Sequence, residues 1–136
     1  MTGTVAVMAR LRLPASVALV AWTLLVWTTR LRNIWADESL STGEQLRSTA
    51  LAGSFTVLAV VLGVALWRRA TWLRPAVLAL AGWTAAVWVV RAVGIATADH
   101  SLGFVVVHLV LAIVSWVLAG LAAREVTAPA TVRPAS

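Results

Sequence analysis

Two arginines in this sequence each precede a carboxylate by eight residues. Arg30 is followed by Glu38, and Arg91 is followed by Asp99. Because a guanidinium binds carboxylate and phosphate oxygens bidentately, the pair predicts a basic site that holds an anionic headgroup or a carboxylate. The simpler alternative is that each arginine extends to a polar boundary and pairs with the acid of its own loop.

His108 is the other residue whose side chain could take part in chemistry, as a haem ligand, a proton relay or a quinone contact. Bis-histidine ligation needs a second histidine on a facing segment, and the only other one, His100, shares the same stretch of chain. The simpler interpretation is a neutral imidazole bonded to a neighbouring hydroxyl or carbonyl. Asp99-His100-Ser101 contains the residue types of a catalytic triad, but adjacent residues cannot adopt its geometry, and Asp99 or Ser101 is better placed as a helix N-cap. We predict no metal site, no cofactor and no catalytic residue.

Composition indicates what must position these residues. Of 136 residues, 61% are hydrophobic and 12% are charged, and mean hydropathy is +0.92. Soluble domains carry about 25% charged residues and disordered chains have low hydrophobicity, so both classes are excluded. There is no cysteine, which removes disulfides and thiolate metal sites. The chain is therefore predicted to be an integral membrane protein.

Four stretches have the length of about 20 apolar residues that a membrane-crossing helix needs. They cover residues 13–29, 49–67, 73–90 and 102–123, and the third extends to Ala98 if Arg91 is tolerated near the headgroups. We expect an all-α, polytopic fold of four transmembrane helices. Residues 1–12 are expected to be a cytoplasmic N-terminal segment, 68–74 a cytoplasmic loop and 124–136 a disordered cytoplasmic tail.

Charge distribution predicts the orientation. With the N-terminus cytoplasmic, most arginines fall inside, and the net charge of +6 lies on the cytoplasmic face, where anionic lipids attract it. We predict a multi-pass protein of a bacterial plasma membrane with both termini cytoplasmic. Nucleic-acid binding is not predicted, because no soluble segment carries a basic stripe with interleaved aromatic residues.

The chain also resembles itself. Shifted by 61 residues, Pro14 matches Pro75, Trp22-Thr23 matches Trp83-Thr84, Val26-Trp27 matches Val87-Trp88 and Arg30 matches Arg91. The pattern predicts a tandem duplication of a two-helix unit, covering 13–67 and 75–123. Because each unit has an even number of spans, the two units are expected to be related by a pseudo-two-fold axis along the membrane normal.

Small residues on the second and fourth spans predict how helices meet. Ser115, Ala119 and Ala123 recur at a spacing of four, and Phe55, Ala59 and Gly63 are their equivalents at a shift of 60, after a one-residue deletion in the loop. Small side chains let helices approach closely in lipid, so we expect these two spans to touch near the cytoplasmic side.

Tryptophan positions divide into two groups. Mid-span Trp22 and Trp83, with the adjacent Thr23 and Thr84, are candidates to line a small cavity, although a threonine hydroxyl usually bonds to the carbonyl of the preceding turn. The tryptophans near predicted span ends are expected at the membrane interface. These are Trp27, Trp35, Trp67, Trp72 and Trp88.

The sequence contains no lysine and is rich in arginine, alanine and valine. This amino-acid usage is typical of a high-GC bacterium. The repeat pattern resembles small four-helix membrane proteins of such actinobacterial-type organisms, and this resemblance implies no particular activity. Three functions remain open. The first is a non-catalytic accessory, assembly or scaffolding subunit of a larger envelope complex, with a membrane-protein partner or self-association. The second is a small transporter or channel with paired arginines at the outer face, and the third is a haem- or quinone-associated redox subunit that uses His108.

Overall fold

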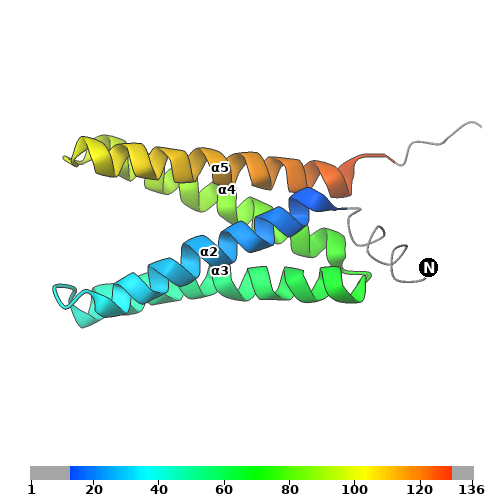
Figure 1. Cartoon of the computed structure of the whole chain (residues 1–136), viewed down its shortest axis with the longest axis horizontal. Coiled ribbons are helices and arrows are strands. Elements are labelled where there is room, and N and C mark those ends of the chain that lie inside the picture. Colours follow the sequence, from blue (N-terminus) through cyan, green and yellow to red (C-terminus); the bar gives the residue numbers. More distant parts are fainter. Residues whose placement is uncertain (1–12, 130–136) are drawn as a thin grey trace, which may run out of the picture.

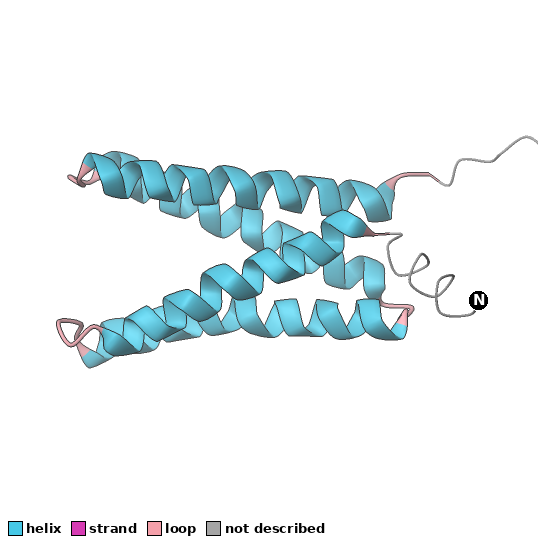
Figure 2. Cartoon of the chain, in the orientation of Figure 1, coloured by secondary structure: helices cyan, strands magenta, loops and turns pink. Residues whose placement is uncertain are grey.

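The computed structural model describes residues 13–129, which form four α-helices joined by short loops (Figure 2). The helices are α2 (Pro14–Ala36), α3 (Thr42–Arg68), α4 (Leu73–Thr97) and α5 (Leu102–Thr127). All four are long and apolar enough to cross a membrane. The prediction of an all-helical fold with four spans is confirmed, and the chain is a multi-pass membrane protein.

The helices extend beyond the apolar stretches that predict them. α2 continues to Ala36, α3 begins at Thr42, and α4 reaches Thr97, close to the longer of its two expected ends. The hydrocarbon core sets the length of the apolar stretch but not of the helix, so polar residues continue the helix into the headgroup layer. α5 continues to Thr127, so residues 124–127 of the expected disordered tail are helical. Residues 1–12 and 130–136 lie outside the described residues.

Three of the helix N-termini have identifiable caps. Ser41 and Glu44 form a capping box at α3, in which the Ser41 Oγ accepts from the Glu44 N–H at 3.3 Å and the Glu44 carboxylate accepts from the Ser41 N–H at 2.9 Å. The expected N-cap of the fourth span is Ser101, whose Oγ accepts from the Phe104 N–H at 3.3 Å. α2 has no side-chain cap from its own segment, and Glu125 of α5 takes that place.

The helices pack as two crossed hairpins (Figure 1). α2 packs against α3 and α5, and α4 packs against the same two helices. We call the end with the 37–41 and 98–101 loops the two-loop end, and the opposite end, where α2 begins and α5 ends, the termini end. At the termini end α2 lies beside α5, and toward the two-loop end it diverges from α5 (Figure 1).

The small-residue ridges of α3 and α5 face the bundle interior. Ala59 and Ala119 are both buried in the core. α3 and α5 are not among the four closely packed helix pairs, and the expected contact between the second and fourth spans along these ridges stays a prediction. Gly63 of the α3 ridge faces α2, because a Cβ added there would lie 3.8 Å from the Cγ1 of Val20, an ordinary van der Waals distance. On α5, Ser115 is buried and Ala123 is partly buried.

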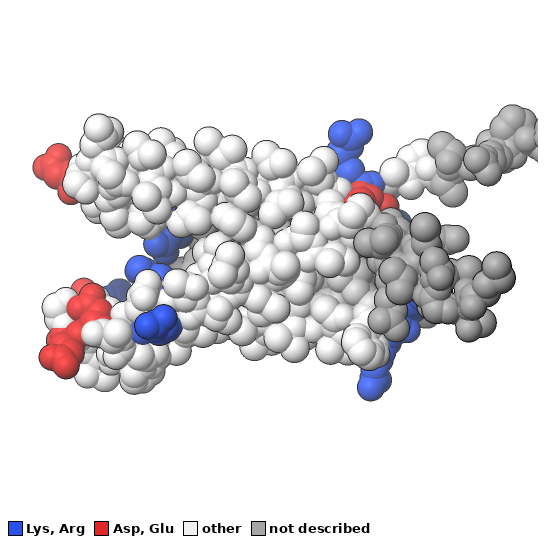
Figure 3. Space-filling view, viewed as in Figure 1, with Lys and Arg blue, Asp and Glu red and all other residues white. Residues whose placement is uncertain are grey.

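Charge is confined to the two ends of the molecule. In Figure 3 the acidic and basic side chains lie at the two-loop end and the termini end, with an uncharged belt between them. Large apolar side chains such as Val57, Val110 and Ile113 are exposed on this belt. A surface of this kind is suited to lipid rather than to water.

Candidate functional site

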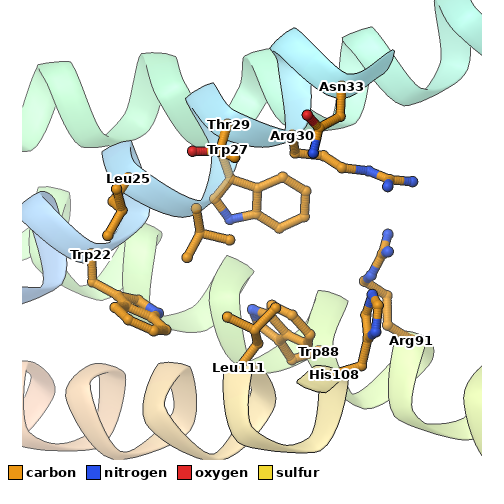
Figure 4. A pocket seen from close by; sticks show the side chains of 11 residues that line it. Trp22, Leu25, Trp27, Thr29, Arg30, Asn33, Trp88, Arg91, His108 and Leu111 are labelled. Carbon is orange, nitrogen blue, oxygen red and sulfur yellow. The ribbon is translucent and has the colours of Figure 1, made fainter. Parts of the chain in front are cut away.

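A cleft of about 370 Å³ lies between α2, α4 and α5, toward the two-loop end (Figure 4). α2 supplies one wall, α5 supplies the opposite wall and α4 lies between them. No carboxylate lines the cleft. Its lining residues are Trp22, Leu25, Val26, Trp27, Thr29, Arg30, Asn33, Trp88, Arg91, His108 and Leu111.

The two predicted arginines come together in this cleft. Arg30 extends from α2 and Arg91 from α4, and both guanidinium groups point into the same part of the cleft (Figure 4). The Cζ of Arg91 lies 5.9 Å from the ring centroid of Trp27 and 5.9 Å from that of Trp88. Both distances are within the range of a cation–π contact, so indole faces support this guanidinium.

Neither guanidinium has an anionic partner. Within residues 13–129 no carboxylate lies within ion-pair distance of Arg30 or Arg91, and the Nε of Arg91 is buried without a hydrogen-bond partner. The expected pairing of each arginine with the acid of its own loop is wrong. Glu38 and Asp99 are exposed in the loops beyond the helices and do not line the cleft.

Asp37, directly after α2, is bonded within its own turn and not to Arg30. Its carboxylate accepts from the Ser39 N–H at 3.0 Å and from the Ser39 hydroxyl at 2.5 Å. These hydrogen bonds hold the pKa of Asp37 below its ordinary value, with a smaller contribution from the charge of Arg30. The carboxylate is therefore engaged within its own turn.

The tryptophans beneath the arginines belong to the core and not to the membrane interface. Trp27 is 4% exposed and Trp88 is 3% exposed, which corrects the expectation for these two residues. Trp27 stacks on Phe55 with ring centroids 4.0 Å apart and planes 4° apart, and its centroid lies 6.3 Å from that of Trp88. A signal for this arrangement exists in the sequence, because each tryptophan stands three residues before its arginine, on the same helix face.

His108 lines the cleft from α5, next to Arg91 (Figure 4). Its Nδ1 lies 2.8 Å from the carbonyl oxygen of Phe104. A carbonyl can only accept, so Nδ1 carries the proton and Nε2 is the nitrogen left for a ligand. His100 and His108 lie on opposite sides of the Phe104 ring, with centroids 4.4 Å and 3.9 Å from it. Residues 13–129 contain no cluster of three or more His, Asp or Glu side chains that could hold a metal ion.

The four cavity candidates separate in the structure. Trp22 lines the cleft and donates to the Ser115 Oγ at 2.9 Å, whereas Trp83 donates to the Ser54 Oγ at 3.0 Å outside it. Thr23 and Thr84 are buried and do not line the cleft. The Oγ1 of Thr84 has no partner, so the expected bond to the preceding turn does not form there.

Glu125 is a residue whose role the sequence did not reveal. Its carboxylate accepts from the Ala15 N–H at 2.7 Å, the Ser16 N–H at 3.0 Å and the Ser16 Oγ at 2.9 Å. The only available signal is indirect. Pro14 predicts a helix start, Leu13 cannot cap it, and the cap must come from elsewhere in the chain.

The fold and the cleft define a class, a four-span helical membrane protein with two unpaired arginines in a tryptophan-lined cleft. Comparison with protein families, with curated proteins and with solved structures found no match to this chain.

Proposed function

We propose that this protein binds an anionic ligand between Arg30 and Arg91. One observation carries the proposal: two guanidinium groups point into one cleft that no carboxylate lines. Like charges held close together repel, and an ion in or near a bilayer is costly unless it is compensated. An anion between them removes both penalties, and its oxygens accept charge-assisted hydrogen bonds from both arginines.

The setting that we propose is a bacterial plasma membrane, with the two-loop end outside and the termini end in the cytoplasm. The described arginines of the termini end are Arg68, Arg69, Arg74 and Arg124, and Glu125 is the single described acid there. This excess of positive charge supports a cytoplasmic termini end that contacts anionic lipids. The cleft then opens on the outer side.

We also propose that the two hairpins are a tandem repeat related by a pseudo-two-fold axis. Two hydrogen bonds support it. The Trp22–Ser115 bond joins α2 to α5, and the Trp83–Ser54 bond joins α4 to α3. Trp22 and Trp83 are equivalent positions, and Ser54 lies one residue before Phe55, the equivalent of Ser115, so exchanging the hairpins brings each bond close to the place of the other.

The three functions expected from the sequence bear differently on this proposal. A transporter or channel with paired outer arginines needs such an anion site, and the cleft favours this alternative. An accessory or scaffolding subunit is compatible with it, since a bound anion can belong to a partner or to a lipid. A redox role through His108 is the least supported, because His108 and His100 flank Phe104 rather than face a common centre.

Binding of inorganic phosphate to the full chain tests the proposal directly. The protein is purified in maltoside micelles, which carry no charge, and titrated by calorimetry. Arg30→Gln and Arg91→Gln are each expected to weaken binding by about tenfold or more, because a hydrogen bond to a charged group contributes about 1.5–3 kcal/mol. Arg74→Gln is the matched control, since Arg74 is exposed at the other end of α4. Equal affinity in all three variants would contradict the proposal.

A further inference from the structure

The polar groups of the cleft lie at one depth. Arg30 and Arg91 stand six residues before the ends of α2 and α4, and His108 stands six residues after the start of α5. At about 1.5 Å per residue, all three lie about 9 Å from the two-loop end of their helices. The helices have 23 to 27 residues and are therefore longer than the hydrocarbon core of about 30 Å. Centred on such a core, α2 and α4 extend only a few Å beyond it, so the backbone of both arginines lies about 5–7 Å below the headgroup boundary. A long arginine side chain can span that depth.

The deeper part of the cleft is apolar. Below the arginines its walls are the indoles of Trp27 and Trp88, and farther in they are Leu25, Leu111 and Trp22. Trp22 lies eight residues before Arg30 on α2, which is about 12 Å along the helix. The lining therefore changes from cationic to apolar in the direction that a lipid changes from headgroup to chain.

The cleft is bounded at its deep end and open at its side. The Trp22–Ser115 hydrogen bond joins α2 to α5 at 2.9 Å, and the cleft begins on the two-loop side of this bond. Leu25 lines the cleft and is 62% exposed, so the apolar part of the cleft is open to the surroundings on this side of α2. In the space-filling view basic atoms are visible in the notch at the two-loop end (Figure 3). A hydrocarbon chain can therefore enter between α2 and α5 from the surrounding lipid.

Two charged donors face the expected position of the anion. Both are guanidinium forks, one from α2 and one from α4, and the imidazole of His108 lines the cleft from α5. A carboxylate offers two oxygens in one plane, whereas a phosphate offers oxygens in a tetrahedral arrangement. Guanidinium forks that approach from two separate helices, α2 and α4, match the phosphate better.

We infer that the ligand is an amphiphile with a phosphate headgroup, taken laterally from the outer leaflet. Arg30 and Arg91 hold the phosphate, and the hydrocarbon chain lies against Trp22, Leu25 and Leu111. This inference rests on the proposed anion binding. It adds that the ligand has a hydrocarbon chain, where that hydrocarbon chain lies in the cleft and by which route it enters.

The test compares dodecyl phosphate with inorganic phosphate on the full chain in maltoside micelles. Leu111→Trp fills the apolar part of the cleft and leaves both arginines in place. It is expected to weaken dodecyl phosphate binding by about tenfold, the loss expected when several chain methylenes no longer find apolar contact, and to change inorganic phosphate binding by less than about twofold. Leu109→Trp is the matched control, because Leu109 is exposed on the same helix outside the cleft. Both variants are compared in the same micelle, so partition of the chain into detergent cancels.

The possible outcomes show whether the anion-binding proposal, the amphiphile proposal or both fail. If Arg91→Gln weakens the binding of both dodecyl phosphate and inorganic phosphate but Leu111→Trp weakens the binding of neither, the anion-binding proposal stands and the amphiphile proposal is excluded. If neither phosphate binds through Arg91, both proposals fail together. Leu25→Trp provides a second block from the opposite wall, and because Leu25 is 62% exposed, the larger side chain does not disturb the core. A Leu25→Trp protein that still binds dodecyl phosphate at full strength overturns the inference.

Discussion

At the scale of single residues, the unusual feature is a cation without a carboxylate. An arginine inside a membrane protein normally pairs with an acid or with backbone carbonyls. Here the guanidinium of Arg91 lies 5.9 Å from the centroids of Trp27 and Trp88, and its Nε has no partner. A cation–π contact stabilises the charge without neutralising it. The tryptophans thus hold the arginine in position and leave its charge available to a ligand.

Trp27→Ala is expected to destabilise the protein by about 3–5 kcal/mol, because it removes a buried ring that touches both Phe55 and Arg91. Trp35→Ala, eight residues along the same helix, removes a side chain that is 61% exposed and is expected to change stability by about 0.5 kcal/mol or less. The free energy of unfolding in SDS, followed by circular dichroism, measures both effects. Equal losses in the two variants would show that Trp27 does not belong to the core.

At the scale of helices, the termini end is closed by an unusual cap. The first free N–H groups of α2 donate to Glu125, which comes from the last turn of α5. A carboxylate at a helix N-terminus satisfies these donors and interacts favourably with the helix dipole. The bond also joins the first and last described helices, so it stabilises the bundle as well as α2.

Glu125→Ala is expected to expose the first turn of α2, with a loss of about 0.5–2 kcal/mol, the usual range for removing an N-cap. Hydrogen exchange at Ala15 and Ser16 should then be faster, while α3 is unchanged. Ser41→Ala is the reciprocal control, because it removes the local cap of α3 and should speed exchange only there. If exchange at Ala15 and Ser16 is the same in Glu125→Ala as in the original protein, the cap does not form.

The helices could be predicted from the sequence, but their arrangement could not. Apolar length gave four spans, and Ser101 gave a helix start, because both depend on neighbouring residues. The equivalence of Arg30 and Arg91 was visible at a shift of 61. That they share one cleft depends on how the hairpins cross, and this follows from tertiary contacts between the hairpins such as the Trp22–Ser115 hydrogen bond. Glu125 was missed for the same reason, since its partners lie at the other end of the chain.

At the scale of the whole molecule, two hairpins meet at one end and part at the other. At the termini end α2 is held to α5 by Glu125, and near the middle by the Trp22–Ser115 bond. At the two-loop end these contacts stop and the cleft begins. The uncharged belt between the charged ends places the opening at one membrane surface (Figure 3). Which surface it faces decides whether the ligand comes from the outer or the inner leaflet.

The absence of cysteine allows this orientation to be measured with single-cysteine variants. Glu38→Cys and Ala98→Cys place a thiol in each exposed loop of the two-loop end, and Thr71→Cys places one in the exposed loop of the termini end. Because positive charge is retained on the cytoplasmic side, a membrane-impermeant maleimide added to intact cells should label the first two and not the third. Permeabilised cells, in which all three should react, are the control. Labelling of Thr71→Cys alone in intact cells would show that the protein has the opposite orientation in the membrane. The cleft would then face the cytoplasm, and the amphiphile would have to come from the inner leaflet.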